Sequence, residues 1–146
     1  MIWDVNLAAA EKKAEDISLN GGNAAAVECD VLDKTSAVKA LNSTISMYGT
    51  GDILINGAGG SRPEATTSAR IDFFNIEPEN LNKVINLNYM SAVIPSQAAG
   101  RVFAEKRSGV ILNISSIAGI SPLTRAIGYS SGKAAMNNFT QWLAVH

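Results

Sequence analysis

The sequence predicts an α/β fold in which a doubly wound parallel sheet carries helices on both faces. Short apolar runs alternate along the chain with longer segments of helical periodicity, which is the pattern of consecutive strand-helix-strand units. Such units are right-handed and place their strands parallel in one sheet. Of the 146 residues, 47% are hydrophobic and 17% are charged, so the chain can bury a substantial core.

The first half of the chain supplies three strands and two helices. Apolar residues from Leu7 to Ile17 recur at helical spacing in the first helix. Either Asp33 or Thr35 can cap the second helix. The expected elements, in order, are a strand at 2–3, a helix at 6–17, a strand at 25–29, a helix that Gly49 and Gly51 close, and a strand at 52–55.

The second half supplies one strand, two helices and two long loops. A loop as long as 61–78 inside a compact domain is usually functional or mobile. Pro95 should bend the long helix around it or remove one of its hydrogen bonds. The expected elements, in order, are a loop at 61–78, a helix at 79–106, a strand at 110–114, a loop at 115–126 and a helix at 127–145.

Charge and composition argue against several classes of protein. The formal net charge is −1 and no basic stripe is present, so a nucleic-acid partner is disfavoured. The apolar runs are far shorter than the ~20 residues of a membrane helix, and no cationic, apolar leader opens the chain. Cys29 is the single cysteine and His146 the single histidine, which disfavours a disulfide, a zinc cluster and a Ser-His-Asp relay. We therefore expect a cytoplasmic, metal-free domain that does not contact membranes.

Tyr129 and Lys133 are the first candidates for catalysis. Residues four apart on a helix lie on the same face, one turn apart. A nearby ammonium stabilises the phenolate form of a tyrosine, which makes the tyrosine a general acid or base. The alternative is a solvated pair without a chemical role.

Polar and glycine-rich segments end two of the expected strands. Ser115 and Ser116 follow the strand at 110–114, where a hydroxyl could bind a substrate oxygen. The run 56–59, Asn-Gly-Ala-Gly, ends the strand at 52–55, and its glycines would let a cofactor approach the backbone closely. The alternatives are the start of a loop and a plain turn.

Two acidic residues follow the first two strands. Asp4 comes directly after the strand at 2–3, and Asp30 after the strand at 25–29. In a dinucleotide-binding fold an acidic residue after the second strand binds the adenosine ribose hydroxyls. The alternative is a helix cap, since Asp4 also precedes a helix.

In their order and spacing these motifs resemble the short-chain dehydrogenase/reductase family, whose fold is Rossmann-like, through essentially the whole chain. The resemblance implies that Tyr129 and Lys133 are the catalytic pair of the family. It implies that Ser116 is the catalytic serine, from its distance to Tyr129. Asn88 matches the family's helix asparagine, and Asn86 is the competing choice.

The resemblance implies a nicotinamide-dependent carbonyl reductase or alcohol dehydrogenase. Asp30 and Val31 look like the family's adenine contact. Asn56, Gly57 and Ala58 look like part of its Asn-Asn-Ala-Gly motif, and so become cofactor-binding candidates.

The roles that the resemblance implies follow the reductive direction. Ser116 would hold the carbonyl oxygen, and Tyr129 would protonate it as the hydride arrives. Lys133 would also bind the nicotinamide ribose, and Asn88 would help to hold a water of the proton relay. Asp4 has no basic neighbour, and its charge would repel a 2′-phosphate, so NAD is favoured over NADP.

A narrower resemblance concerns the substrate. Gly57 stands where most family members have a second asparagine. With this glycine the run resembles the D-mannonate (fructuronate) oxidoreductase branch of the family. That branch acts on a sugar acid, whose carboxylate a cation should hold. Arg62 and Arg125 lie on loops expected near the site, although each could be an ordinary surface arginine. A 3-oxoacyl-type or sugar-alcohol reductase, with the same catalytic residues, is the alternative. The branch resemblance also rests on the residues after the glycine run, Pro63, Ala65, Thr66 and Thr67.

The family's phosphate-binding glycine turn and its last strands have no counterpart in the sequence. We therefore expect residues 1–146 to form a single, partial dinucleotide-binding catalytic domain with an incomplete sheet. In the family, the helices that match 79–106 and 127–145 often pack against a second subunit. A homo-oligomer, dimer or tetramer, with a small-molecule substrate is expected. The competing class is a catalytically silent fragment that only associates with partners.

Overall fold

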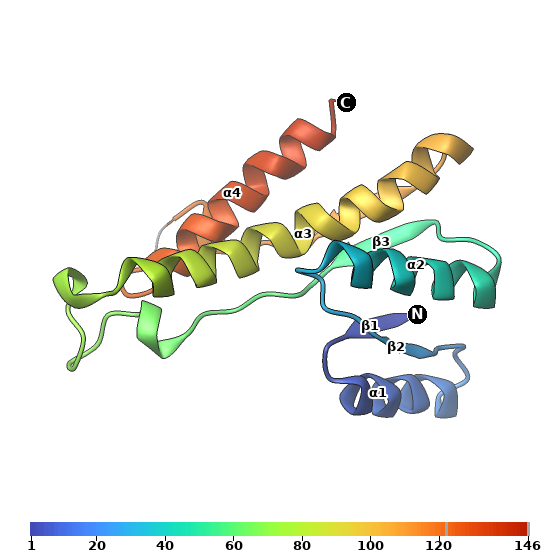
Figure 1. Cartoon of the computed structure of the whole chain (residues 1–146), viewed down its shortest axis with the longest axis horizontal. Coiled ribbons are helices and arrows are strands. Elements are labelled where there is room, and N and C mark those ends of the chain that lie inside the picture. The colour runs from blue at the N-terminus through green and yellow to red at the C-terminus, as the bar shows by residue number, and fades with distance from the viewer. Residues whose placement is uncertain (122, 146) are drawn as a thin grey trace. The chain divides into compact units, whose positions relative to one another are not determined.

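The computed structural model describes residues 1–121 and 123–145, and the predicted alternation of strands and helices is present in it (Figure 1). Its elements, in order, are β1 (Ile2–Asp4), α1 (Leu7–Leu19), β2 (Ala26–Glu28), α2 (Lys34–Tyr48), β3 (Ile53–Asn56), α3 (Pro78–Lys106), β4 (Val110–Asn113) and α4 (Ile127–Leu143). Three short 3₁₀ helices lie in the two long loops: η1 (Pro63–Ala65), η2 (Phe73–Asn75) and η3 (Ile117–Gly119).

The predicted boundaries hold to within two residues, and the caps explain where the helices begin. The side chain of Asn6 accepts a hydrogen bond from the Ala9 N–H at the start of α1. Asp33, and not Thr35, caps α2, because its carboxylate accepts from the Thr35 N–H at 2.8 Å. Pro95 lies inside α3, and the helix runs on through it.

The strands form two parallel pairs, β1 with β2 and β3 with β4. In the first pair Ile2 lies opposite Ala26 and Asp4 opposite Glu28. In the second pair the N–H groups of Val110 and Ile114 donate to the carbonyls of Asp52 and Asn56, both at 2.9 Å. These bonds advance by four residues on each strand, as a parallel ladder requires. The expected parallel sheet is therefore present as two pairs.

The chain divides into two compact units. The first unit comprises 1–54 and 94–111, and the second comprises 55–93 and 112–146. In the first unit β1 and β2 lie between α1 and α2, so this pair is covered on both faces as predicted (Figure 1). The prediction of one domain over 1–146 stays a prediction.

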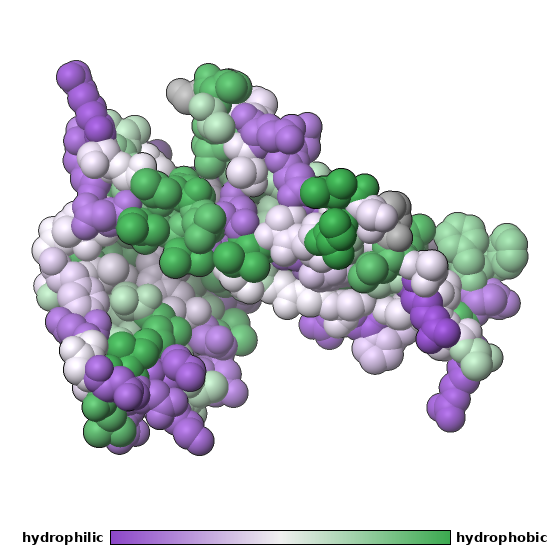
Figure 2. Space-filling model, turned by 180° about the vertical axis from the view of Figure 1, so that it is seen from behind, coloured by the Kyte–Doolittle hydropathy of each residue, from purple (hydrophilic) through white to green (hydrophobic). Residues whose placement is uncertain are grey.

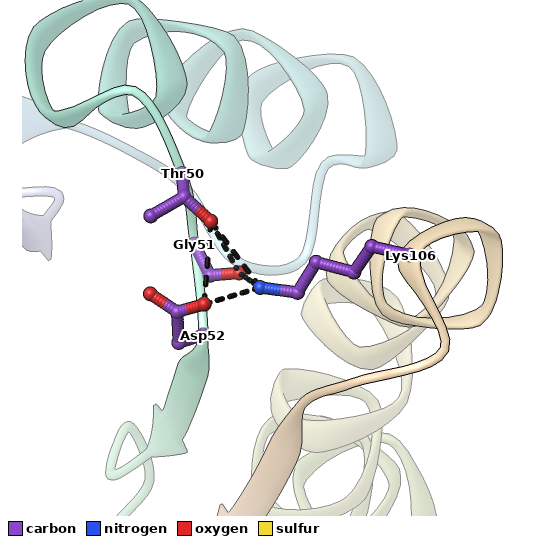
Figure 3. Close-up of polar contacts among 4 residues, drawn as sticks. All are labelled: Thr50, Gly51, Asp52 and Lys106. Carbon is purple, nitrogen blue, oxygen red and sulfur yellow. Dashed lines mark hydrogen bonds and ion pairs between the residues drawn. The ribbon is translucent and has the colours of Figure 1, made fainter.

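A hydrophobic core forms in the first unit where α2 and the second half of α3 meet the strands. Its buried residues are Leu41, Ala99 and Phe103, with Trp3 and Ile111 among the half-buried residues packed against them. The end of α3 is tied to the turn before β3, because the Lys106 ammonium contacts Thr50, Gly51 and Asp52 (Figure 3).

In the second unit, helices α3 and α4 approach closely at a glycine. A Cβ on Gly132 would lie 2.7 Å from the Cβ of Asn88 and 3.2 Å from the Ile85 carbonyl oxygen. A larger residue would push the helices apart. Gly132 directly precedes Lys133, so this contact sets how closely the start of α4, which carries Lys133, lies against α3.

Alternate side chains of β3 and β4 are exposed, although strands of parallel sheets are ordinarily buried on both faces. The exposed side chains are apolar: Ile53, Ile55, Val110, Leu112 and, just beyond β4, Ile114. Figure 2 shows hydrophobic groups of this kind at the surface among hydrophilic ones.

In the described part of the chain, no helix is both long and apolar enough to cross a membrane. Over the same residues, no three His, Cys, Asp or Glu side chains gather as metal ligands would.

Candidate active site

Tyr129 and Lys133 lie together on the first turns of α4, in the second unit. The Lys133 ammonium is 5.8 Å from the centre of the Tyr129 ring. It donates a hydrogen bond to the carbonyl oxygen of Ile114, directly after β4, at 2.7 Å. The lysine side chain is thus stretched from α4 to the carboxyl end of β4.

Lys133 is buried to an unusual degree for a lysine, with 5% of its surface exposed. Burial lowers the pKa of its ammonium below the ordinary value of 10.5, and the nearby Tyr129 acts in the opposite direction. None of the ion pairs among the described residues includes it. An ammonium has three hydrogens to donate; the Ile114 carbonyl and a weak contact with the Met136 sulfur at 4.0 Å take two of them, which leaves one for a further acceptor.

Asn88 is fully buried in α3, whereas the competing Asn86 is exposed. Its amide nitrogen donates to the carbonyls of Gly60 at 2.7 Å and Val84 at 2.8 Å. Its amide oxygen accepts from the Gly60 N–H at 3.0 Å. Both amide hydrogens are therefore in use, and the side chain holds the loop after β3 against α3.

The glycine-rich loop passes directly between these groups. A Cβ on Gly59 would lie 2.6 Å from the Asn88 amide oxygen and 3.5 Å from the Lys133 ammonium. The hydroxyl of Ser91 donates to the Ala58 carbonyl at 3.0 Å and holds the loop from the same helix. The sequence singled out the glycine run 56–59 but missed Ser91, because a contact between distant segments leaves no local pattern.

The side chain of Asn56, one of the predicted cofactor-binding residues, is engaged within the second unit. It is 5% exposed, and its amide nitrogen donates to the Asn113 side-chain oxygen at 2.8 Å and to the Ala92 carbonyl at 3.3 Å. These bonds join the ends of β3 and β4 to α3. Its side chain therefore holds the frame of the site.

The two serines after β4 are engaged differently. The hydroxyl of Ser115 contacts the amide oxygen of Asn137 on α4. The hydroxyl oxygen of Ser116 accepts from the Ala118 N–H at 3.1 Å and caps η3. Since a hydroxyl both accepts and donates, Ser116 keeps its hydrogen for a further partner.

Adjacent threonines hold the backbone at the two arginines proposed for substrate binding. The Thr66 hydroxyl donates to the Arg62 carbonyl at 2.8 Å, and the Thr67 N–H donates to the Arg125 carbonyl at 3.0 Å. Both arginines are exposed. The loop at 61–78 and the loop before α4 therefore meet in the second unit.

The acidic candidates lie in the first unit, at the ends of paired strands. The Cys29 N–H donates to the Asp4 carbonyl at 3.0 Å, which makes Asp4 and Asp30 near neighbours. One carboxylate oxygen of Asp4 accepts from the Asn6 N–H at 2.8 Å, and one of Asp30 from the Leu32 N–H at 2.9 Å. Among the described residues, no donor meets the second oxygen of either carboxylate, so each can accept from another donor. Val31 is half-buried and packs against the core under α2.

A sequence profile of the short chain dehydrogenases matches residues 1–146. The chain belongs to the short-chain dehydrogenase/reductase family. An uncharacterized oxidoreductase of Haemophilus influenzae is 39% identical to this chain, over 99% of it and 54% of that protein. The uncharacterized oxidoreductase UxuB of Bacillus subtilis is 37% identical, over 90% of this chain and 50% of that protein. The chain spans about half the length of these curated relatives.

A solved structure resembles this chain closely. It is a Haemophilus protein described as a candidate D-mannonate oxidoreductase and crystallised with bound NAD. It superposes with a TM-score of 0.92 at 39% identity, over 98% of this chain and 55% of that one.

Proposed function

We propose that the chain carries the acid-base half of an NAD-dependent oxidoreductase that interconverts a small polar carbonyl compound and its alcohol. The observation that carries the proposal is the buried Lys133 ammonium. It lies beside the ring of Tyr129 and close to the backbone of Gly59, at the ends of β3 and β4. Strand ends of this kind are where α/β folds bind their ligands.

A nicotinamide cofactor fits the residues around Lys133. A Cβ on Gly57 would meet only Ile114, at 3.9 Å, so the exposed loop leaves room for a close approach. The Lys133 ammonium can donate to a ribose hydroxyl beyond the Ile114 carbonyl that it already binds. When bound, the nicotinamide supplies or accepts the hydride. The bound NAD of the Haemophilus structure supports this choice of cofactor.

The residues of the second unit polarise the substrate and transfer the proton. Ser116 donates its hydroxyl hydrogen to the substrate carbonyl oxygen and polarises it. Tyr129 transfers its phenolic proton to the same oxygen, and the Lys133 ammonium stabilises the phenolate that remains. Asn88 keeps the loop at Gly60 in place while this occurs.

In the first unit, Asp4, Asp30 and Val31 would bind the adenosine part of the cofactor. Asp4 and Asp30 each have one carboxylate oxygen in a local turn, and the other is available to hydroxyl groups. A carboxylate repels a 2′-phosphate, which favours NAD over NADP.

For the substrate we propose a sugar acid of the D-mannonate or D-fructuronate type. Arg62 and Arg125 are exposed cations whose backbones are held by neighbouring threonines, and a guanidinium matches a carboxylate in shape and charge. The description of the Haemophilus protein supports the same substrate class.

The test is Tyr129→Phe, which removes the hydroxyl and keeps the ring. Fructuronate-dependent oxidation of NADH should be lost, while NAD binding by calorimetry should be nearly unchanged. Substantial turnover by Tyr129→Phe would overturn the role of Tyr129. Absence of NAD binding by the unaltered chain would favour a silent fragment.

A further inference from the structure

Two side-chain contacts join the end of β4 to α4. The amide nitrogen of Asn113 donates to the Thr140 hydroxyl at 2.9 Å, and the Ser115 hydroxyl contacts the Asn137 amide oxygen. Residues two apart on extended backbone point the same way, and residues three apart on a helix lie on one face. Asn137 and Thr140 therefore meet the same side of the chain that leaves β4.

The contact between Lys133 and the Ile114 carbonyl lies between these two bonds in the sequence. Ile114 separates Asn113 from Ser115, and Lys133 precedes Asn137 by one helical turn. Any shift of this segment along α4 that breaks the flanking bonds must also move the carbonyl to which the ammonium is bound.

The flanking bonds are parts of a longer chain of hydrogen bonds. The Thr140 hydroxyl accepts from Asn113 and donates to the Met136 carbonyl at 2.8 Å. The Asn113 side-chain oxygen accepts from Asn56, which is almost fully buried. The Ser115–Asn137 and Asn56–Asn113 contacts are partly buried, so breaking one of them leaves a partner without its bond, which costs more than the bond itself contributes. The Asn113–Thr140 bond is exposed, and it contributes through its place in the same chain of bonds.

We propose that Asn137 and Thr140 are positioning residues, which clamp the segment after β4 against α4. The clamp keeps the Ile114 carbonyl within reach of the Lys133 ammonium, and it fixes the backbone from which Ser116 follows. The catalytic meaning of the clamp rests on the proposed oxidoreductase function. Its geometric content, the placement of Lys133, can be measured without any turnover.

The experiment follows the acylation of Lys133 by acetic anhydride, read by mass spectrometry, as a function of pH in the whole chain. The midpoint of the profile reports the pKa of Lys133, and the limiting rate at high pH reports its accessibility. Thr140→Val removes one flanking bond and keeps the shape of the side chain, and Asn137→Ala removes the other. We expect both variants to raise the limiting rate about fivefold. Both should also move the midpoint upward, because Lys133 becomes better solvated.

Two further variants make the result specific. Thr140→Ser keeps the hydroxyl and should restore the unaltered profile. Asn138→Ala changes the exposed neighbour of Asn137, whose side chain makes no hydrogen bond to the residues that the structure describes, and should leave the profile unchanged. The clamp is overturned if Thr140→Val and Asn137→Ala, folded by circular dichroism, keep the unaltered profile, or if Thr140→Ser behaves as Thr140→Val does. Failure of the Tyr129→Phe test would remove the proposed reaction but would not alter these profiles.

Discussion

Gly59 is the residue at which the site has the least room. A methyl group there would enter the space of the Asn88 amide oxygen, 2.6 Å away. Gly59→Ala should therefore lower the free energy of unfolding by about 1–3 kcal/mol, because the loop or Asn88 must move and the φ of +158° at Gly59 is unfavourable for alanine. Urea denaturation followed by circular dichroism measures the change. Gly57→Ala is the control, since its Cβ would meet an ordinary contact at 3.9 Å. Equal losses in the two variants would contradict the crowding at Gly59.

A substitution at Arg125 tests whether the substrate carries a carboxylate. Arg125→Ala should raise KM for a sugar acid about tenfold, because a charge-assisted hydrogen bond to the carboxylate is lost. KM for a neutral polyol should change little. Arg70→Ala removes an exposed arginine from the loop at 61–78 and serves as the control. Equal effects of Arg125→Ala on the acid and the polyol would count against a carboxylate contact.

Residue identities were easier to predict from the sequence than residue roles. The spacing of Tyr129 and Lys133 predicts a shared helix face, and the structure places them on one. The sequence favoured Asn88 over Asn86, and the structure buries Asn88 and exposes Asn86, because only one side of α3 faces the loop. The bonds of Asn113 with Asn56 and Thr140 join positions 57 and 27 apart, and no short motif encodes them.

At the scale of elements, the ion pair at the end of α3 links a helix to a strand. The Lys106 ammonium contacts the Asp52 carboxylate and donates to the Gly51 carbonyl at 2.6 Å (Figure 3). The hydrogen bond from Lys106 is the main cause that lowers the pKa of Asp52 below 3.8. A lowered folded-state pKa contributes stability above the unfolded-state value, and that stability is lost as the pH falls through the folded value.

Lys106→Met should therefore lower the free energy of unfolding near neutral pH, and the difference from the unaltered chain should shrink as the pH falls below 3.8. Urea titrations across that range measure it. Lys83→Met breaks the pair with Glu79, which has both partners well exposed, and should cost less. A loss in Lys106→Met that does not vary with pH would show that the contact of the ammonium with the Phe103 ring matters more than the pair with Asp52.

The elements themselves follow from periodicity and capping. Every strand and α-helix of the structure coincides with a predicted one, because apolar spacing and residues such as Asp33 and Gly49 mark the element ends. The three 3₁₀ helices were not predicted. A single turn of three residues is too short for a periodic signal, and local side-chain caps such as Asp72 and Ser116 decide where it forms.

At the scale of the whole molecule, the sequence predicted the fold class and the family, and the sheet differs in detail. The hydrophobic pattern predicts strands and their parallel direction, but it does not say which strands are neighbours. The structure holds two parallel pairs, with the acidic candidates in one compact unit and the candidate catalytic residues in the other. The adenosine-binding and acid-base parts of the proposed function are therefore assigned to residues of different compact units.

The exposed isoleucines, valine and leucine of β3 and β4 also bear on how the molecule behaves in concentrated solution. Exposed apolar side chains of this kind can pack against the same surface of another molecule. Salts that strengthen hydrophobic burial should therefore increase the association of the chain with itself. The solubility of the folded chain, and not its unfolding, should therefore limit the protein concentration that can be reached.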